Sequence, residues 1–388
     1  MRLFAFTSLL ADVSSEMLYP LTPLFLTVVL RAPVAAVGGM EGAAEAVASL
    51  LKIWSGGWSD RARRRMPMVV GGYALSSAAR PLLGVVTAWP QAVALRVGDR
   101  VGKGLRTSPR DSLIVDATEE GQRGRAFGFH RAADSLGAVL GPLLALVLLA
   151  AFHGHMRPVF LVAAIPGALS LIPLLAVKEK PRPAEHRRGG EGPPLGRRYW
   201  WFIAVVAVFG LGNSTDALIL LRAKGLGMST SMVVLAYVAY NVVYATLAWP
   251  LGSRGDRVGK HRVLGMGFAV FAVVYAGLAL IHSSALIWPL LAVYGVYAAA
   301  TEGVARALVA DLAPAGRRGL ALGVYHGTVG VLALVAGTVG GVMFDSIGPW
   351  APFALGAGTA AAACLILLAW RKGPGAAPIT RASSTAVA

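Results

Sequence analysis

The chain has 388 residues, of which 56% are hydrophobic and only 14% are charged, and its mean hydropathy is +0.64. A soluble domain carries about 25% charged residues. Apolar runs of the length that a membrane-crossing helix needs recur along most of the sequence. This composition excludes a secreted enzyme, a cytosolic enzyme and a disordered chain, and it predicts a polytopic membrane protein.

The net charge of +17 does not indicate binding to nucleic acid, because the basic residues are spread over many loops instead of one soluble face. The single cysteine, Cys364, lies in an apolar run, which excludes an intramolecular disulfide and a cysteine-based zinc site. Asp12 and Glu16 interrupt the first apolar run, so the N-terminus lacks the pattern of a cleavable signal peptide. We therefore expect this run to be a membrane span.

Hydropathy in a window of about 19 residues predicts twelve spans. They cover residues 4–30, 34–56, 67–87, 88–105, 122–151, 157–177, 199–221, 227–250, 263–282, 284–304, 318–342 and 349–370. Most Lys and Arg residues follow the even-numbered spans or lie near the chain ends, and the alternate connections hold only Arg31, Arg157, Arg222 and Lys224. Since basic residues favour the cytoplasmic side of short loops, we expect both termini in the cytoplasm. We further expect the protein to lie in the inner membrane of a bacterium.

The two halves of the chain repeat each other at an offset of about 195–200 residues. Ser14-Ser15-Glu16 parallels Ser214-Thr215-Asp216, and Gly56, Asp60 and Arg61 parallel Gly252, Asp256 and Arg257. We predict an all-α membrane protein with a six-helix bundle at 1–178, a cytoplasmic linker at 179–198, a second six-helix bundle at 199–372 and a disordered tail at 373–388. Repeated halves of this kind enclose a substrate site at their interface, so a transporter is the leading interpretation.

The loop that begins Gly56-Gly57-Trp58-Ser59-Asp60-Arg61 resembles motif A of the major facilitator superfamily, and a second copy begins at Gly252. Arg96 matches the arginine of motif B, although Arg100 stands where that motif expects glycine. Gly137-x-x-x-Gly141-Pro142 resembles motif C, which in this superfamily marks antiporters. The resemblance covers essentially the whole chain and implies twelve helices in two pseudo-symmetric bundles. None of these motifs gives the substrate.

Motif A predicts a gate between the halves. A short cytoplasmic turn can place the carboxylate of Asp60 at a helix N-terminus, which attracts negative charge. Neighbouring arginines can bond to acids or to helix C-termini. A positive-inside anchor is the competing interpretation of the basic run. The predicted gating residues are Gly56, Asp60, Arg61, Arg64, Asp256, Arg257, Gly137, Gly141 and Pro142.

Polar residues inside the predicted spans indicate a cavity. Arg96, Asp99, Arg100 and Lys103 share one helix face, which must point at protein or at a water-filled space because charges in hydrocarbon are costly. A structural salt network is the alternative. Acids in a low-dielectric site favour their neutral form, which suits reversible protonation. We predict Glu16, then Asp134 and Asp12, as proton carriers, and structural pairing competes for each.

The predicted cavity residues are Glu41, Glu45, Arg96, Asp99, Arg100, His130, Arg131, Asn213, Asp216, Tyr240, Asn241, Glu302, Tyr325 and His326. Tyr237, Tyr240 and Tyr244 recur at helical spacing and either line an aromatic wall or pack helices. An acidic and aromatic cavity suits a cationic or amphipathic organic molecule, whereas the arginines of the fourth span suit an anion. The sequence leaves both open.

These features predict a secondary transporter that moves a small molecule by alternating access, by proton-coupled efflux. A proton symporter importing a small anionic metabolite, or an exporter of a metal or metal chelate, is the alternative. No P-loop, nucleophile or zinc-enzyme motif is present, so we expect no enzyme activity, no cofactor and no bound metal, with the proton gradient as energy source. The expected partners are the substrate, protons and the lipid bilayer, and we expect a monomer.

Overall fold

The computed structural model describes residues 2–62, 64–118, 123–177, 179, 193–314 and 317–370, without the side chains of residues 60, 61, 115, 123–128 and 370. Every regular element within these ranges is a helix. The predicted tail at 373–388 and residues 180–192 of the predicted linker lie outside the described residues.

The helices of the first half follow the predicted spans. They are α1 (Arg2–Leu18), α2 (Thr22–Leu24), the π-helix η1 (Phe25–Val29), α3 (Val34–Arg61), α4 (Met66–Leu82), α5 (Trp89–Asp116), α6 (Arg123–Ala151), α7 (Met156–Val162), α8 (Ala164–Leu169) and α9 (Ile172–Leu175). The first span consists of α1, α2 and η1, and the sixth consists of α7 to α9. Short breaks divide both.

The second half repeats this order. Its helices are α10 (Arg197–Gly210), α11 (Asp216–Gly225), α12 (Thr230–Val258), α13 (Lys260–Leu280), the 3-10 turn η4 (Ser284–Leu286), α14 (Ile287–Leu312), α15 (Arg318–Ser346) and α16 (Ala351–Trp370). The seventh span consists of α10 and α11. The predicted twelve-span arrangement in two bundles fits these helices.

Eight of the spans are long and apolar enough to cross a membrane by length and composition alone. They are α3, α6, the α7–α9 segment, and α12, α13, α14, α15 and α16. The other four fall short for a physical reason: α1, α4 and the α10–α11 pair are short or interrupted, and α5 carries many charged residues.

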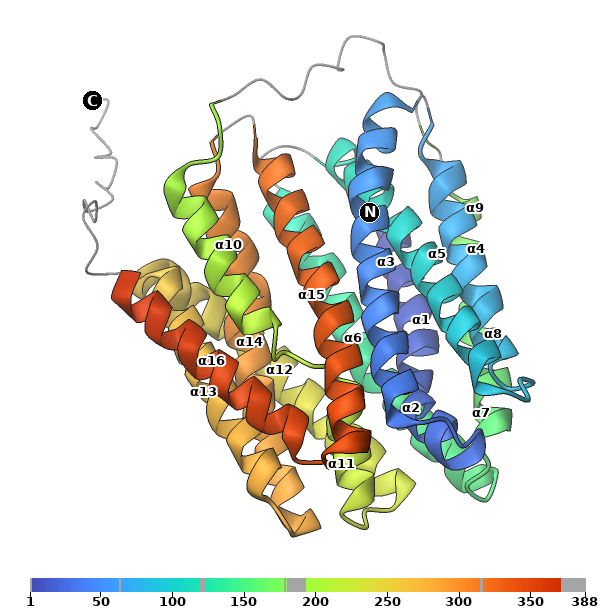
Figure 1. Ribbon diagram of the computed structural model, residues 1–388. Helices are drawn as coiled ribbons and strands as arrows, with labels where there is room; N and C mark the ends of the chain where they lie inside the picture. The colour runs from blue at the N-terminus through green and yellow to red at the C-terminus, as the bar shows by residue number, and fades with distance from the viewer. Residues whose placement is uncertain are drawn as a thin grey trace, which may run out of the picture.

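Each half packs as a bundle, and the halves meet along two helix pairs (Figure 1). In the first half α1 packs on α6, and α5 packs on α3 and α4; in the second half α14 packs on α12 and α13. Between the halves, α3 lies along α15 and α6 contacts α12. The interface therefore runs between the helices that hold the predicted site residues.

The first helix of each half is broken near the same depth. In the first half, α1 ends at Leu18 just before Pro20, which has no N–H to continue the helix. In the second half, α10 ends at Gly210 and α11 restarts at Asp216, so the predicted span 199–221 consists of two helices with a break between them. The Thr215 side chain accepts a hydrogen bond from the Ala217 N–H and caps the new helix. Discontinuous helices of this kind expose backbone groups at a substrate site.

The fourth span is longer than predicted, because α5 continues past residue 105 to Asp116. Its extra turns have polar partners: Arg106 lies over the Tyr73 ring at 3.9 Å, and Arg110 is paired with Asp111 at 2.8 Å. These contacts allow a charged helix end to pack on α4. They place basic residues at the end of the bundle that we predict to be cytoplasmic.

Glycines bring α3 and α15 into direct backbone contact. A Cβ atom on Gly38 or Gly337 would collide with the backbone of the opposite helix, and one on Gly42 would lie 2.6 Å from the Ala333 carbonyl oxygen. Toward the other end of the pair the fit loosens, since a Cβ on Gly327 would meet only the Ile53 side chain at 3.6 Å. The two helices converge near α2 and α11 and separate toward the start of α10 (Figure 1). The two halves are therefore in contact at the end that we predict to face away from the cytoplasm.

Candidate functional site

Glu16 joins the two halves. It lies half-buried on α1, and its Oε2 accepts a hydrogen bond of 2.9 Å from the hydroxyl of Tyr237 on α12. The ring of Tyr19, one turn further along the chain, lies 5.4 Å from the Tyr237 ring. No ion pair to Glu16 occurs among the described residues. This carboxylate therefore has a hydroxyl partner across the interface and no cationic partner.

Asp216, the counterpart of Glu16 in the repeat, begins the second half of the broken span. Its Oδ1 accepts a hydrogen bond of 2.7 Å from the Tyr294 hydroxyl of α14. Asp216 also lines a small pocket with Tyr237, Tyr240 and Tyr294 and with three aliphatic residues, Ile219, Leu220 and Leu291. The two acids are thus connected through Tyr237, which contacts Glu16 and lines the Asp216 pocket.

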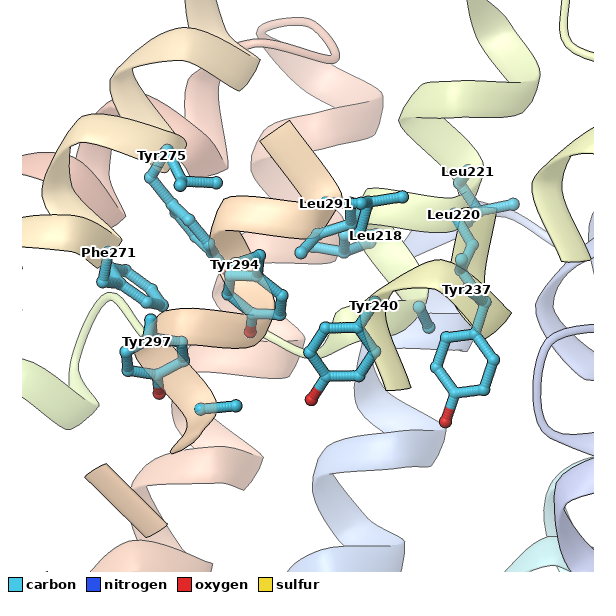
Figure 2. Packing of buried hydrophobic residues seen from close by; sticks show 14 of the residues in the cluster. Leu218, Leu220, Leu221, Tyr237, Tyr240, Phe271, Tyr275, Leu291, Tyr294 and Tyr297 are labelled. Atoms are coloured by element: carbon cyan, nitrogen blue, oxygen red, sulfur yellow. The ribbon is translucent and has the colours of Figure 1, made fainter. Parts of the chain in front are cut away.

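Tyrosines form the wall of this region. Tyr240 lies with its ring 5.7 Å from that of Tyr237 and 5.4 Å from that of Tyr294, and Tyr294 lies 5.1 Å from Tyr297. Figure 2 shows these four rings with their hydroxyl groups pointing to one side of the cluster. Tyr240 therefore lines this pocket, and the tyrosines of α12 both pack helices and present an aromatic surface. Contact of Tyr240 with substrate stays a prediction.

The predicted charged face of the fourth span lies in a buried ion-pair network. Arg96 holds both carboxylate oxygens of Glu41 on α3, at 2.9 and 3.0 Å, and approaches Asp99 at 3.6 Å. Asp99 in turn accepts a 2.9 Å bond from Arg80 on α4, which also donates to the Ala11 carbonyl oxygen. All four side chains are 9% exposed or less. Two acids thus compensate two arginines.

Arg80 is the member of this network that the sequence-based reasoning missed. It lies within the apolar third span, so an isolated arginine there was itself a signal that an acid on a neighbouring helix should pair with it. Arg100, one turn beyond Arg96, is also buried. In this conformation the side chains of the network are buried among helices and do not line a solvent-filled cavity. Contact of Glu41, Arg96, Asp99 and Arg100 with substrate stays a prediction.

The motif C glycines lie directly behind two of the predicted proton carriers. A Cβ atom on Gly137 would lie 2.8 Å from the Cβ of Asp12, and one on Gly141 would lie 2.8 Å from the Cβ of Glu16. Pro142 follows within α6 and is buried. These glycines therefore let α6 approach α1 closely at the level of Asp12 and Glu16.

Asp134, the third predicted carrier, has a nearby histidine partner. Its Oδ2 lies 3.4 Å from His130 Nδ1 on the same helix. Arg131, between them, contacts the second half of the protein: it donates to the Tyr244 hydroxyl and lies 3.4 Å from Glu302 Oε2, and Tyr244 donates to the same Glu302 oxygen at 2.8 Å. Arg131 and Glu302 are about half exposed, so this inter-half contact lies in an accessible space.

The remaining predicted cavity residues are not gathered in one place. Asn241 donates to the carbonyl of Tyr237 in its own helix, and Glu45 contacts only Ser49 by hydrogen bonding among the described side chains. Tyr325 and His326 contact each other on α15, with ring centroids 5.3 Å apart. Asn213 lies half-buried in the break between α10 and α11, next to Asp216 in the chain.

The predicted gate is described only in part. The side chains of Asp60 and Arg61 lie outside the described residues, and Arg64 is exposed. The buried basic residue of this loop is Arg65, which bonds the Ser59 carbonyl oxygen and Asp116. Gly56 faces Ser108 of α5. The role of this loop as a gate stays a prediction.

In the second copy of motif A, Lys260 bridges Asp256 and Asp311 at 3.2 and 2.6 Å, and Arg257 is exposed. Gly259 ends α12 with φ of 102°, a conformation that favours glycine. This explains why the second copy keeps a glycine at that position.

Comparison with known proteins agrees with this arrangement. The family model of the Major Facilitator Superfamily matches residues 4–234 and again residues 200–386. The chain belongs to the major facilitator superfamily. It is therefore a multi-pass membrane transporter, and the two matches, which overlap over residues 200–234, together span both halves of the repeat.

Among its relatives, an uncharacterized transporter of this superfamily from Methanocaldococcus jannaschii is 35% identical over 376 residues, which is 94% of this chain and 93% of that protein. An uncharacterized protein of Mycobacterium tuberculosis is 31% identical over 362 residues, 89% of this chain and 87% of its own. A multidrug resistance protein of Aeromonas hydrophila is 25% identical over 329 residues, 82% of this chain and 81% of its own. A solved D-xylose–proton symporter shares the fold, with a TM-score of 0.75 at 16% identity, covering 94% and 95% of the two chains.

Proposed function

We propose that this superfamily member is a proton-coupled exporter of a small organic molecule in the inner membrane of a bacterium, with both termini cytoplasmic and a monomer as the working unit. The observation that carries the proposal is the contact between Glu16 and Tyr237. It places a carboxylate without an ion-pair partner at the moving interface between the halves. Alternating access would expose this carboxylate first to one side of the membrane and then to the other, so that it can take up a proton in one state and release it in the next.

Two further features support export by exchange. The Gly137 and Gly141 positions of motif C pack behind Asp12 and Glu16, so the motif that marks antiporters in this superfamily lies against the proposed proton carriers. One relative carries a name for multidrug resistance, which is consistent with export of organic compounds. Import of an anion by proton symport is the competing proposal, and Arg100, a buried arginine with no ion pair among the described residues, is the basic residue that would serve it.

Inverted membrane vesicles provide the test. Respiration acidifies their interior and quenches acridine orange, and a panel of cationic, neutral and anionic organic compounds is then added outside. An exchanger lets its substrate enter while protons leave, so fluorescence should recover in wild-type vesicles and not in Glu16→Gln vesicles. Vesicles in which no compound collapses the proton gradient, while the purified protein binds one of them, would identify a sensor in place of a transporter.

A further inference from the structure

We propose that the pocket beside Asp216 binds the positively charged head group of an organic amine or quaternary ammonium compound. This names the substrate class of the exporter proposed above and rests on that function. The site is built from α11, α12 and α14 of the second half, next to the interface with the first half.

The carboxylate of Asp216 is the first element of this site. Asp99 and Glu41 are each bonded to an arginine, and Glu302 lies near Arg131. Asp216 has only the Tyr294 hydroxyl on Oδ1, and no ion pair or second hydrogen bond to it occurs among the described residues. A carboxylate between aliphatic and aromatic side chains gains most from a cation, because little solvent screens the attraction.

The tyrosine rings are the second element. Tyr237, Tyr240 and Tyr294 line the pocket with ring centroids 5.4 to 5.7 Å apart along the series, and Figure 2 shows the three rings side by side. Aromatic faces attract cations within about 6 Å, and cages of several rings with an acid are the usual binding site for quaternary ammonium groups. We assign the contact of Tyr240 with the cation to its ring, which lies beside that of Tyr294.

The size of the pocket sets which part of the ligand it takes. It holds about 180 Å³ of space, including its open mouth. In this conformation it has room for about one water molecule, so it must widen to take a head group, and it does not hold a whole drug-sized molecule. The remainder of the ligand would lie between the halves, near Tyr19 and Glu16.

The electrostatics disfavour an anion at the same place. The N-terminus of α11 would attract negative charge, but Asp216 itself occupies that first turn, and Thr215 caps it. Among the arginines of the first half, Arg80 and Arg96 are bonded to Asp99 and Glu41, and Arg131 lies beside Glu302. A second anion would therefore meet a carboxylate and tyrosine rings with no uncommitted cation in the pocket lining.

Calorimetric titration of the full chain in lipid nanodiscs tests this site, with empty nanodiscs as the blank. The probes are benzyltrimethylammonium, its uncharged carbon isostere neopentylbenzene, and benzenesulfonate. The cation should bind about ten-fold more tightly than either of the other two, since only the cation uses both the carboxylate and the rings. Equal affinity for the cation and its isostere, or tighter binding of the sulfonate, overturns the proposal.

Two sets of variants assign the binding to these residues. Asp216→Asn keeps an acceptor for Tyr294 and removes the charge, and should weaken cation binding about ten-fold, whereas Asp311→Asn, a surface change of equal charge, should not. Tyr240→Leu should weaken cation binding about three-fold, whereas Tyr240→Phe, which keeps the ring, should bind the cation as tightly as the wild type. If Asp216→Asn does not fold, the Tyr240 pair decides: equal binding by Leu and Phe variants overturns the site. Proton-coupled flux of an anion would refute the head-group assignment and leave the export mechanism intact.

Discussion

The carboxylate of Asp345, at the end of α15, accepts hydrogen bonds from the backbone N–H groups of Val34 and Ala35 at the start of α3, with O···N distances of 3.2 and 2.8 Å. The first N–H groups of a helix lack partners within it, and Pro33 has no side chain to cap them. The cap of α3 therefore comes from the other half of the protein, at the end where the α3–α15 pair is closed. It must break whenever that end opens.

Replacing Asp345 with alanine should shift the protein toward the state that opens at this end. Loss of an N-cap costs about 1 kcal/mol, which corresponds to about a five-fold change in the ratio of the two states. Spin labels on cysteines at Val29 and Trp350, in a Cys364→Ser background, should report a larger fraction of long distances between the halves. Asp345→Asn is the intermediate variant, because asparagine keeps one acceptor oxygen for the helix N-terminus where Asp345 uses two. Equal distance distributions for the Ala and Asn variants would mean that Asp345 is not a latch.

Much of the architecture could be predicted from the sequence, whereas the contact of Asp345 with the start of α3 could not. Membrane-length apolar runs and alternating loop charge give the twelve spans, and Pro20 gives the first break. The second break has no proline. Its signal was the run from Gly210 to Thr215, which contains two glycines and ends on a good N-cap residue before Asp216. The pairing of Asp345 with Ala35 joins residues 310 positions apart, and no local spacing specifies it.

The candidate site was predictable to a similar extent. Glu16, Asp216 and Tyr240 stood out as polar groups inside apolar spans, and the structure connects them through Tyr237. The ion pairs of the buried network could not be predicted from the sequence, because Glu41, Asp99 and Arg96 have several possible partners on neighbouring helices. Only the packing of α3, α4 and α5 selects Arg80 and Arg96 as the cations of this network.

Arg80→Ala should destabilise the protein strongly. It removes the 2.9 Å partner of Asp99 and the donor to the Ala11 carbonyl oxygen, both buried. Breaking a buried ion pair costs about 3–5 kcal/mol. Asp99 would keep only the longer 3.6 Å contact with Arg96, which is already bonded to Glu41. The thermal unfolding temperature in detergent should fall well below that of Lys103→Ala, a half-buried basic residue on the neighbouring helix. Adding Asp99→Asn to Arg80→Ala should recover part of the loss. An unchanged unfolding temperature would show that the network is dispensable.

Gly141→Ala should impair transport by separating α6 from α1. The added Cβ would lie 2.8 Å from the Glu16 Cβ and from the Val13 carbonyl oxygen, and 2.9 Å from the Met17 nitrogen. Overpacking of this kind costs about 1–3 kcal/mol, and here it also displaces Glu16. Gly98→Ala is the control, since nothing lies within 4 Å of that position. Vesicle flux should drop for Gly141→Ala and stay near the wild-type rate for Gly98→Ala. The same rate in both would remove motif C from the mechanism.

Glu16→Gln should separate proton coupling from substrate movement. Glutamine keeps an oxygen that can accept the Tyr237 hydroxyl, so the contact between the halves survives while the exchangeable proton is lost. The variant resembles the protonated carboxyl in both alternating states. It should therefore fail to accumulate substrate against a gradient when a proton gradient is imposed, yet still exchange labelled for unlabelled substrate across a vesicle membrane.

Tyr237→Phe provides the complementary control for this prediction. It removes the hydrogen bond and keeps the carboxylate, so proton-driven accumulation should persist at a reduced rate. If Glu16→Gln retains a full proton-driven gradient, the proton is carried elsewhere. Asp12, which lies against Gly137 and has no ion pair among the described residues, is then the stronger candidate, because Asp134 is already paired with His130. Asp12→Asn in the same assay would decide between them.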